Sequence, residues 1–116
     1  MLNIPPPPVP QPLREMLKDY PELIEGLQRR LIDLMSDHAR SIPMFEQAIW
    51  LLEDSLDAFY GDAREELEAA KQSGDPAVIE KAKAKRFLIG SAGSRHPWFD
   101  SDELSDYFDT YRRAFE

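Results

Sequence analysis

The stretch FEQAIWLLEDSLDAFYGDAREELEAA, residues 45–70, decides the fold of this chain. Its apolar residues recur every three or four positions, which is the period of an amphipathic α-helix. Residues 13–38 carry the same period, and the two stretches meet at a break formed by Ser41, Ile42 and Pro43. Two amphipathic helices joined by a short break must fold back on each other or pair with another chain. The sequence therefore predicts an all-α fold.

The apolar face of the second stretch continues across Gly61 without a change of phase. Glycine can end a helix, but the unbroken phase favours one long helix here and leaves open whether it bends. Asp19 is the expected N-cap of the first long helix, and Ser41 that of the second. The predicted seams comprise Ile24, Leu27, Leu31, Leu34 and His38 in the first helix, and Phe45, Ala48, Ile49, Leu52, Leu56, Phe59, Ala63, Leu67 and Ala70 in the second.

Two shorter helices are expected after residues 73–76, whose sequence is Ser-Gly-Asp-Pro. Glycine suits a helix C-cap, aspartate an N-cap and proline the first helical position, so a helix ends and another begins here. The next helix is predicted over residues 77–89, with Phe87, Leu88 and Ile89 as an apolar cluster. Residues 90–97 are predicted to form a loop, and the last helix is predicted to begin within residues 100–103.

The predicted architecture is a small helical bundle built on a long antiparallel helical hairpin with two shorter C-terminal helices. The hairpin is expected to comprise residues 20–73. Residues 1–12 contain six prolines and are expected to form an extended polyproline arm. This arm is interpreted as loose, or as lying across its own domain or a neighbouring subunit. Residues 13–116 are expected to form a single all-α domain.

The charge of the chain limits its partners. There are 14 basic and 22 acidic residues, for a formal net charge of -8. Such a balance disfavours direct binding to nucleic acid or to an anionic membrane, and it favours a cationic partner or serves solubility. Cysteine is absent, which excludes disulfides and thiolate metal sites. No signal-peptide pattern and no apolar run of membrane-spanning length is present, so a cytoplasmic location is expected.

No pattern in the sequence predicts catalysis, a metal or a cofactor. His38 falls on a helix seam and His96 lies in the predicted loop, each without a recognisable ligand partner. The acidic groups at residues 53–57 and 65–68 are interpreted as solvated helix faces. A magnesium-binding E-E-x-x-E pattern would need a third acid where this chain has Ala69. The basic residues Lys81, Lys83, Lys85 and Arg86 are expected to pair with the acidic last helix, in this chain or in a partner.

Aromatic residues are more abundant than a small bundle needs. Trp50, Leu51 and Tyr60 lie off the main seam of the second helix, so that helix is apolar around much of its girth. Either other helices of the same chain cover this surface or another subunit does. The aromatic candidates for partner binding are Trp50, Tyr60, Trp98, Tyr107 and Tyr111. A central apolar cluster is expected to comprise Leu31, Ile49, Trp50, Leu52, Leu56 and Phe59.

Two functional hypotheses follow from these patterns. The first is a non-enzymatic helical protein–protein interaction module that associates with itself as a homodimer. The second is a small acidic inhibitor, phage-encoded or of the immunity type, that blocks the basic nucleic-acid-binding surface of a target protein. Its acidic candidates lie on the last helix and are Asp102, Glu103, Asp106 and Asp109. The sequence identifies neither the partner nor the source of the chain.

Overall fold

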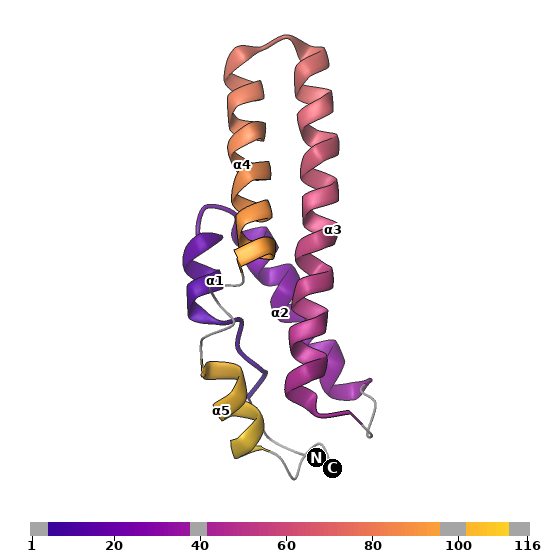
Figure 1. The fold of residues 1–116 in the computed structure, drawn as a ribbon, viewed down its shortest axis with the longest axis vertical. Helices are drawn as coiled ribbons and strands as arrows, with labels where there is room; N and C mark the ends of the chain where they lie inside the picture. The colour runs from indigo at the N-terminus through magenta and orange to yellow at the C-terminus, as the bar shows by residue number, and fades with distance from the viewer. Residues whose placement is uncertain (1–4, 38–41, 96–101, 112–116) are drawn as a thin grey trace.

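The described part of the chain is entirely helical. The computed structural model describes residues 5–37, 42–95 and 102–111. Within these ranges the helices are α1 (Gln11–Met16), α2 (Pro21–Ser36), α3 (Met44–Ser73), α4 (Pro76–Arg95) and α5 (Glu103–Thr110). The predicted all-α fold is confirmed. The molecule measures 54 × 24 × 23 Å because α3 and α4 extend well beyond the other helices (Figure 1).

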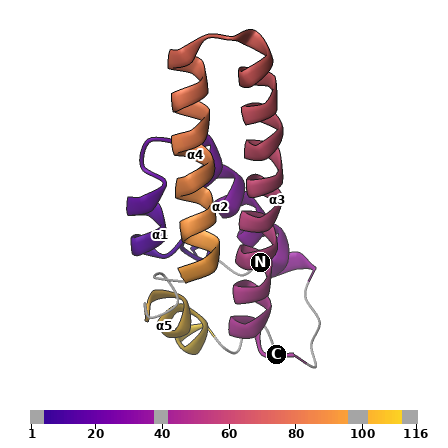
Figure 2. The same ribbon diagram turned by 45° about the horizontal axis from the view of Figure 1, so that its top comes forward.

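The long antiparallel hairpin is formed by α3 and α4, which make the most extensive helix–helix contact in the molecule. The sequence analysis assigned the hairpin to residues 20–73, and therefore to α2 and α3. In the structure α2 instead lies behind α3 and α4, and the upper half of the hairpin projects past it (Figure 1, Figure 2). The side of the hairpin that faces the viewer in Figure 1 is not covered by any described helix.

The helix α4 is longer than predicted, because residues 90–95 are helical rather than a loop. Two glycines allow this by letting α4 lie close to α3. A Cβ atom on Gly90 would come within 3.1 Å of Tyr60 Cε2, and one on Gly93 would lie 3.9 Å from Leu56 Cβ. The composition Gly-Ser-Ala-Gly-Ser therefore reflects close helix packing here and not a turn. Residues 96 and 97 lie outside the described residues.

The prediction of one long second helix is confirmed, since α3 is continuous from Met44 to Ser73. Gly61 lies inside this helix, where glycine is less favourable than alanine by about 1 kcal/mol. A Cβ atom built on Gly61 would meet nothing within 4 Å. The packing of this chain on itself therefore gives no reason for a glycine at this position.

The turn at the free end of the hairpin forms as predicted. Gly74 adopts φ 75°, a left-handed conformation, and caps α3 with a hydrogen bond from its N–H to the carbonyl of Lys71. The Asp75 carboxylate accepts a hydrogen bond of 3.0 Å from the Ala77 N–H. Pro76 is the first residue of α4. These are the three roles that the Ser-Gly-Asp-Pro pattern predicts.

Replacing Gly74 with alanine is expected to lower the free energy of unfolding by about 1 kcal/mol, because a Cβ atom disfavours the left-handed conformation. No atom lies within 4 Å of that Cβ position, so the cost comes from the backbone and not from a clash. Urea denaturation followed by circular dichroism measures it. The matched control is Gly26→Ala inside α2, which is expected to raise the stability, because its Cβ atom would lie at an ordinary contact distance of 3.6 Å from Phe59 Cζ. An unchanged stability of the Gly74 variant would contradict the prediction.

The other predicted helix starts differ from the observed ones by one or two residues. Tyr20, not Asp19, is the N-cap of α2, and its side chain makes no capping hydrogen bond. Pro43 is the N-cap of α3, whereas Ser41 lies outside the described residues. Aspartate and serine are good N-caps, but the proline that follows each of them fixes where the first turn begins.

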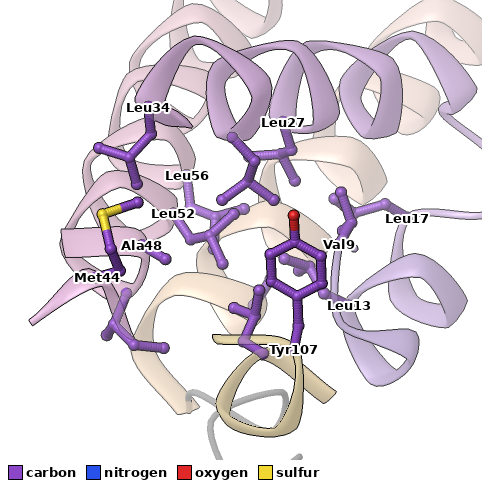
Figure 3. Close-up of a cluster of buried hydrophobic side chains, with 14 of the residues drawn as sticks. Val9, Leu13, Leu17, Leu27, Leu34, Met44, Ala48, Leu52, Leu56 and Tyr107 are labelled. Carbon is purple, nitrogen blue, oxygen red and sulfur yellow. The ribbon is translucent and has the colours of Figure 1, made fainter. Parts of the chain in front are cut away.

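In the described residues a single core lies below the projecting half of the hairpin, where α1, α2, α3, α5 and the last turns of α4 meet (Figure 3). Leucine dominates it, and most of the predicted helix seams contribute. The fully buried large side chains include Leu13, Leu17, Leu27, Leu31, Leu52, Leu56, Ile89 and Leu104. Burying these apolar surfaces supplies the main driving force for folding.

The proline-rich arm lies across its own domain. Val9 is buried in the core beside Leu13. The Gln28 side-chain amide donates a hydrogen bond of 2.6 Å to the carbonyl of Pro7, and the Tyr107 hydroxyl donates one to the carbonyl of Pro5. Burial, and secondarily the neighbouring Tyr111, raise the pKa of Tyr107 above its usual value. The arm is therefore the element that joins α5 to α2.

Candidate interaction surface

The predicted aromatic partner-binding residues occupy different environments. Trp50 is 52% exposed on α3, and Tyr60 is half-buried against Gly90. Tyr107 lies in the core, with its ring 5.1 Å from that of Phe108 in an edge-on arrangement. Tyr111 is half-buried, and Trp98 lies outside the described residues. Among the described aromatic candidates, Trp50 is therefore the one that presents a large apolar surface to solvent.

The predicted central apolar cluster is mostly the core of the single chain. Leu31, Ile49, Leu52 and Leu56 are buried there. Phe59 is half-buried, and the Arg30 guanidinium lies 5.3 Å from the centre of its ring. Trp50 does not join this cluster. It lies at the edge of the contact between α3 and α2, where it lines a hollow with Arg30 and Leu34 of α2.

The acidic candidates of the last helix are only partly available. The Glu103 carboxylate accepts hydrogen bonds from the Gln11 backbone N–H at 2.7 Å and from the Arg14 guanidinium at 3.3 Å. It therefore holds α5 against α1. Asp102, Asp106 and Asp109 are exposed.

In the described part of the chain, the basic residues of α4 do not pair with the last helix of the same chain. Lys85 forms a bidentate contact with Glu66 of α3, at 3.0 and 3.1 Å, and Lys83 lies 3.7 Å from Glu80 of α4 itself. The antiparallel hairpin explains this difference, because it brings the middle of α4 beside the acidic second half of α3 and away from α5 (Figure 1). These partly exposed ion pairs contribute little to stability.

The uncovered side of the hairpin carries two neighbouring hollows lined by α3 and α4 alone. We call this surface the hairpin face. The hollow nearer the core is lined by Glu53, Asp54, Leu56, Asp57, Tyr60, Ile89, Gly90 and Gly93. The one nearer the free end is lined by Gly61, Arg64, Glu65, Leu67, Glu68, Ala69, Lys71, Gln72, Lys83, Arg86 and Phe87. The hairpin face therefore changes its charge along its length.

The hollow nearer the core is acidic. Glu53, Asp54 and Asp57, which we call the acidic segment, are the charged residues that line it. None of these carboxylates forms an ion pair with another residue in the described ranges. The acidic segment therefore gives this part of the hairpin face an uncompensated negative charge.

The hollow nearer the free end is basic. Its four cations, which we call the basic segment, outnumber its two acids, Glu65 and Glu68; they are Arg64, Lys71, Lys83 and Arg86. Lys71 pairs with Glu68 at 3.5 Å, and Lys83 with Glu80. In the described part of the chain, Arg64 and Arg86 form no ion pair. The hollow nearer the free end is therefore locally basic in a chain of net charge -8.

Phe87 is the residue that sequence reasoning missed. It was expected in a buried cluster with Leu88 and Ile89, but only Ile89 is buried, and Phe87 is 74% exposed beside Gly61 and Arg64. The helical period was the available signal. Ile89 and Ala92 are three apart and face α3, whereas Phe87 lies two positions before Ile89 and so points elsewhere.

Other kinds of site find no support in the described ranges. No group of three or more His, Asp or Glu side chains there is arranged to hold a metal ion. None of the helices described combines the length and the apolar character that crossing a bilayer requires. His38 and His96 lie outside the described residues. The chain matches no known protein family, no curated protein and no solved structure.

Proposed function

We propose that this chain is a non-enzymatic helical interaction module that associates with itself through the hairpin face. The observation that carries the proposal is the exposure of Phe87, at 74%, in a hollow on a helix face that no described element covers. A large aromatic side chain so exposed costs free energy in water, and a protein partner that covers it recovers that free energy.

Trp50 is a second exposed aromatic residue of α3, at 52% exposure. It lies one helical turn before Asp54 of the hairpin face, and it lines a separate hollow with Arg30 and Leu34 of α2. Tryptophan and other aromatic residues commonly carry most of the binding free energy in an interface. Trp50 therefore adds an exposed aromatic surface beside the hairpin face, whereas Phe87 lies on that face.

The test is sedimentation velocity over a range of micromolar concentrations. The native chain is expected to form a dimer, and Phe87→Ser is expected to weaken self-association about tenfold or more, as for an aromatic residue at the centre of an interface. Val78→Ser is the matched control, because Val78 is 45% exposed but lies on the other side of the hairpin, beside Tyr20 and Lys81. A native chain that stays monomeric at its highest soluble concentration would refute the proposal.

A second candidate function is that of a small acidic inhibitor that occupies a basic surface of a target protein. Exposed Asp102, Asp106 and Asp109 on α5, together with the net charge of -8, favour it. Association driven by such a surface weakens with salt. Capture of a basic nucleic-acid-binding protein at low salt and its release at high salt would support this candidate. Capture of only acidic or neutral partners, without salt dependence, would count against it.

A further inference from the structure

The order of charges along the hairpin face defines how two copies fit together. Along α3 the acidic segment comes first, Gly61 follows, and the basic segment occupies the part nearer the free end. Asp57 lies four residues before Gly61 and Arg64 three residues after it. At 1.5 Å per residue, these are about 6 Å and about 4.5 Å from Gly61 along the helix axis.

Two copies can meet face to face in a parallel or an antiparallel arrangement. Parallel pairing places the acidic segment of one copy against the acidic segment of the other, and like charges repel. Antiparallel pairing about a two-fold axis near Gly61 places each acidic segment against the basic segment of the other copy. Because a two-fold interface is self-complementary, the contact between an acidic and a basic segment occurs twice, once at each end of the interface.

We infer that the hairpin face is a homodimer interface in which two hairpins pack antiparallel about a two-fold axis at Gly61, acidic segment against basic segment. The inference rests on the proposed function, since it presupposes self-association. It adds the orientation of the two copies and the position of the axis. The product is an antiparallel four-helix arrangement formed by α3 and α4 of both copies.

Gly61 is a second observation that fits this axis. The structure of the single chain gives no packing reason for a glycine there, because its Cβ position is empty to 4 Å. At the axis the two α3 helices approach each other most closely, and a residue without a side chain lets their backbones come near. Phe87 lines the same hollow as Gly61, so the two copies of Phe87 also meet near the axis and are covered there.

Other kinds of partner complement the charges of the hairpin face less well. An acidic helix from a different protein would complement the basic segment but would leave the acidic segment facing like charge or solvent. A nucleic acid would be repelled by the acidic segment and by the net charge of -8. Only a partner that carries both charges in the reverse order matches the whole face, and a second copy of this chain is such a partner.

Charge reversal tests the inference. In one variant the acidic segment is reversed at two positions, Asp54→Lys and Asp57→Lys; in the other the basic segment is reversed, Arg64→Glu and Arg86→Glu. Each variant alone places like charges against each other at both ends of the interface. Self-association of each is expected to weaken at least about 100-fold, since such juxtapositions cost several kcal/mol. An equimolar mixture restores both charge pairings and is expected to form a one-to-one heterodimer within about tenfold of the native affinity.

The outcomes separate the inference from the proposed function. A native chain that remains monomeric refutes both the inference and the proposed function. A native dimer whose two reversed variants self-associate as tightly as the native chain overturns the inference, and Phe87→Ser then decides whether the hairpin face is still the surface of self-association. Variants that weaken singly but do not recover when mixed also overturn it. Recovery on mixing shows that both variants are folded. Binding of an acidic helical peptide or of an oligonucleotide by the native chain, without dimerisation, would assign the face to that ligand instead.

Cross-linking tests the position of the axis independently. The chain contains no cysteine, so a single introduced cysteine reports on one position without background. Gly61→Cys is expected to give a disulfide-linked dimer on mild oxidation, because the two copies of that residue are neighbours at the axis. Val78→Cys, on the other side of the hairpin, is the control and is expected to stay uncross-linked. Equal cross-linking of the two variants would overturn the assigned axis.

Discussion

Replacing Leu52 with alanine is expected to lower the free energy of unfolding by about 3 kcal/mol. Leu52 is fully buried on α3, in the core where α3 meets α2 and α5. Truncation removes three methylene-sized groups from contact and leaves a cavity that helices on several sides hold open. The loss is large because Leu52 belongs to the part of the hairpin that the other helices surround, and not to the part that projects.

Urea denaturation with a fixed chain concentration measures this loss. Ile32→Ala is the matched control, because Ile32 is one of the exposed large apolar residues of the neighbouring helix α2. Its effect is expected to stay within about 0.5 kcal/mol, as for most surface substitutions. Similar losses for the two variants would mean that Leu52 is not in the core.

Replacing Val9 with aspartate is expected to lower the free energy of unfolding by at least about 3 kcal/mol, because it places a charge in the core without a partner. Val9 is buried although it belongs to the proline-rich arm. The substitution therefore displaces the arm or leaves an unpaired carboxylate among Leu13 and its neighbours. Either result also breaks the hydrogen bonds that Pro5 and Pro7 accept from Tyr107 and Gln28.

Pro6→Asp is the control for this variant, since Pro6 lies in the same arm but is exposed. Its stability is expected to match that of the native chain. Thermal unfolding followed by circular dichroism compares the two. If the Val9 variant is as stable as the Pro6 variant, the arm does not contribute to the core.

Structure that depends on neighbouring residues could be predicted from the sequence. Gly74, Asp75 and Pro76 each act through their own backbone preferences or through a short-range hydrogen bond, so their roles could be read without knowing the fold. The continuity of α3 across Gly61 could also be predicted, because the apolar phase of a helix persists whatever covers it. Most of the predicted seam of α3 is buried, from Ala48 to Ala70.

The partner of α3 could not be predicted in the same way. In the residues described, α4 buries only Ile89 and Ala92 completely, and its other core contact from a large apolar residue is that of the half-buried Leu88. Such a helix has no strong apolar stripe, so its sequence gives little sign of where it packs. The glycines that let α4 approach α3 gave residues 90–97 the composition of a loop. Close helix packing and turns favour the same small residues.

The hairpin face was missed because its elements are far apart in the sequence. The acidic segment could be seen as a charge cluster that resembles a solvated helix face, whereas only Lys83 and Arg86 of the basic segment belong to a basic cluster in the sequence. Only the antiparallel hairpin brings Arg86 beside Arg64 and puts Phe87 near Gly61. The functional hypothesis of self-association came from Trp50 and other aromatic residues, whereas the surface that carries it depends on the fold.

The hairpin turn and the arm also differ in the order in which they can form. The two helices that meet at Gly74 are adjacent in the chain, so the first contacts between them require only a short loop to close. Further contacts can then form one after another from the turn toward the core, on a timescale of about microseconds. The arm is held by bonds that span 92 residues between Gln11 and Glu103 and 102 residues between Pro5 and Tyr107. Contacts between residues so far apart in the sequence carry a larger entropic cost of loop closure, so we expect them to form after the hairpin. The base of the molecule is therefore expected to assemble last, and the hairpin turn first.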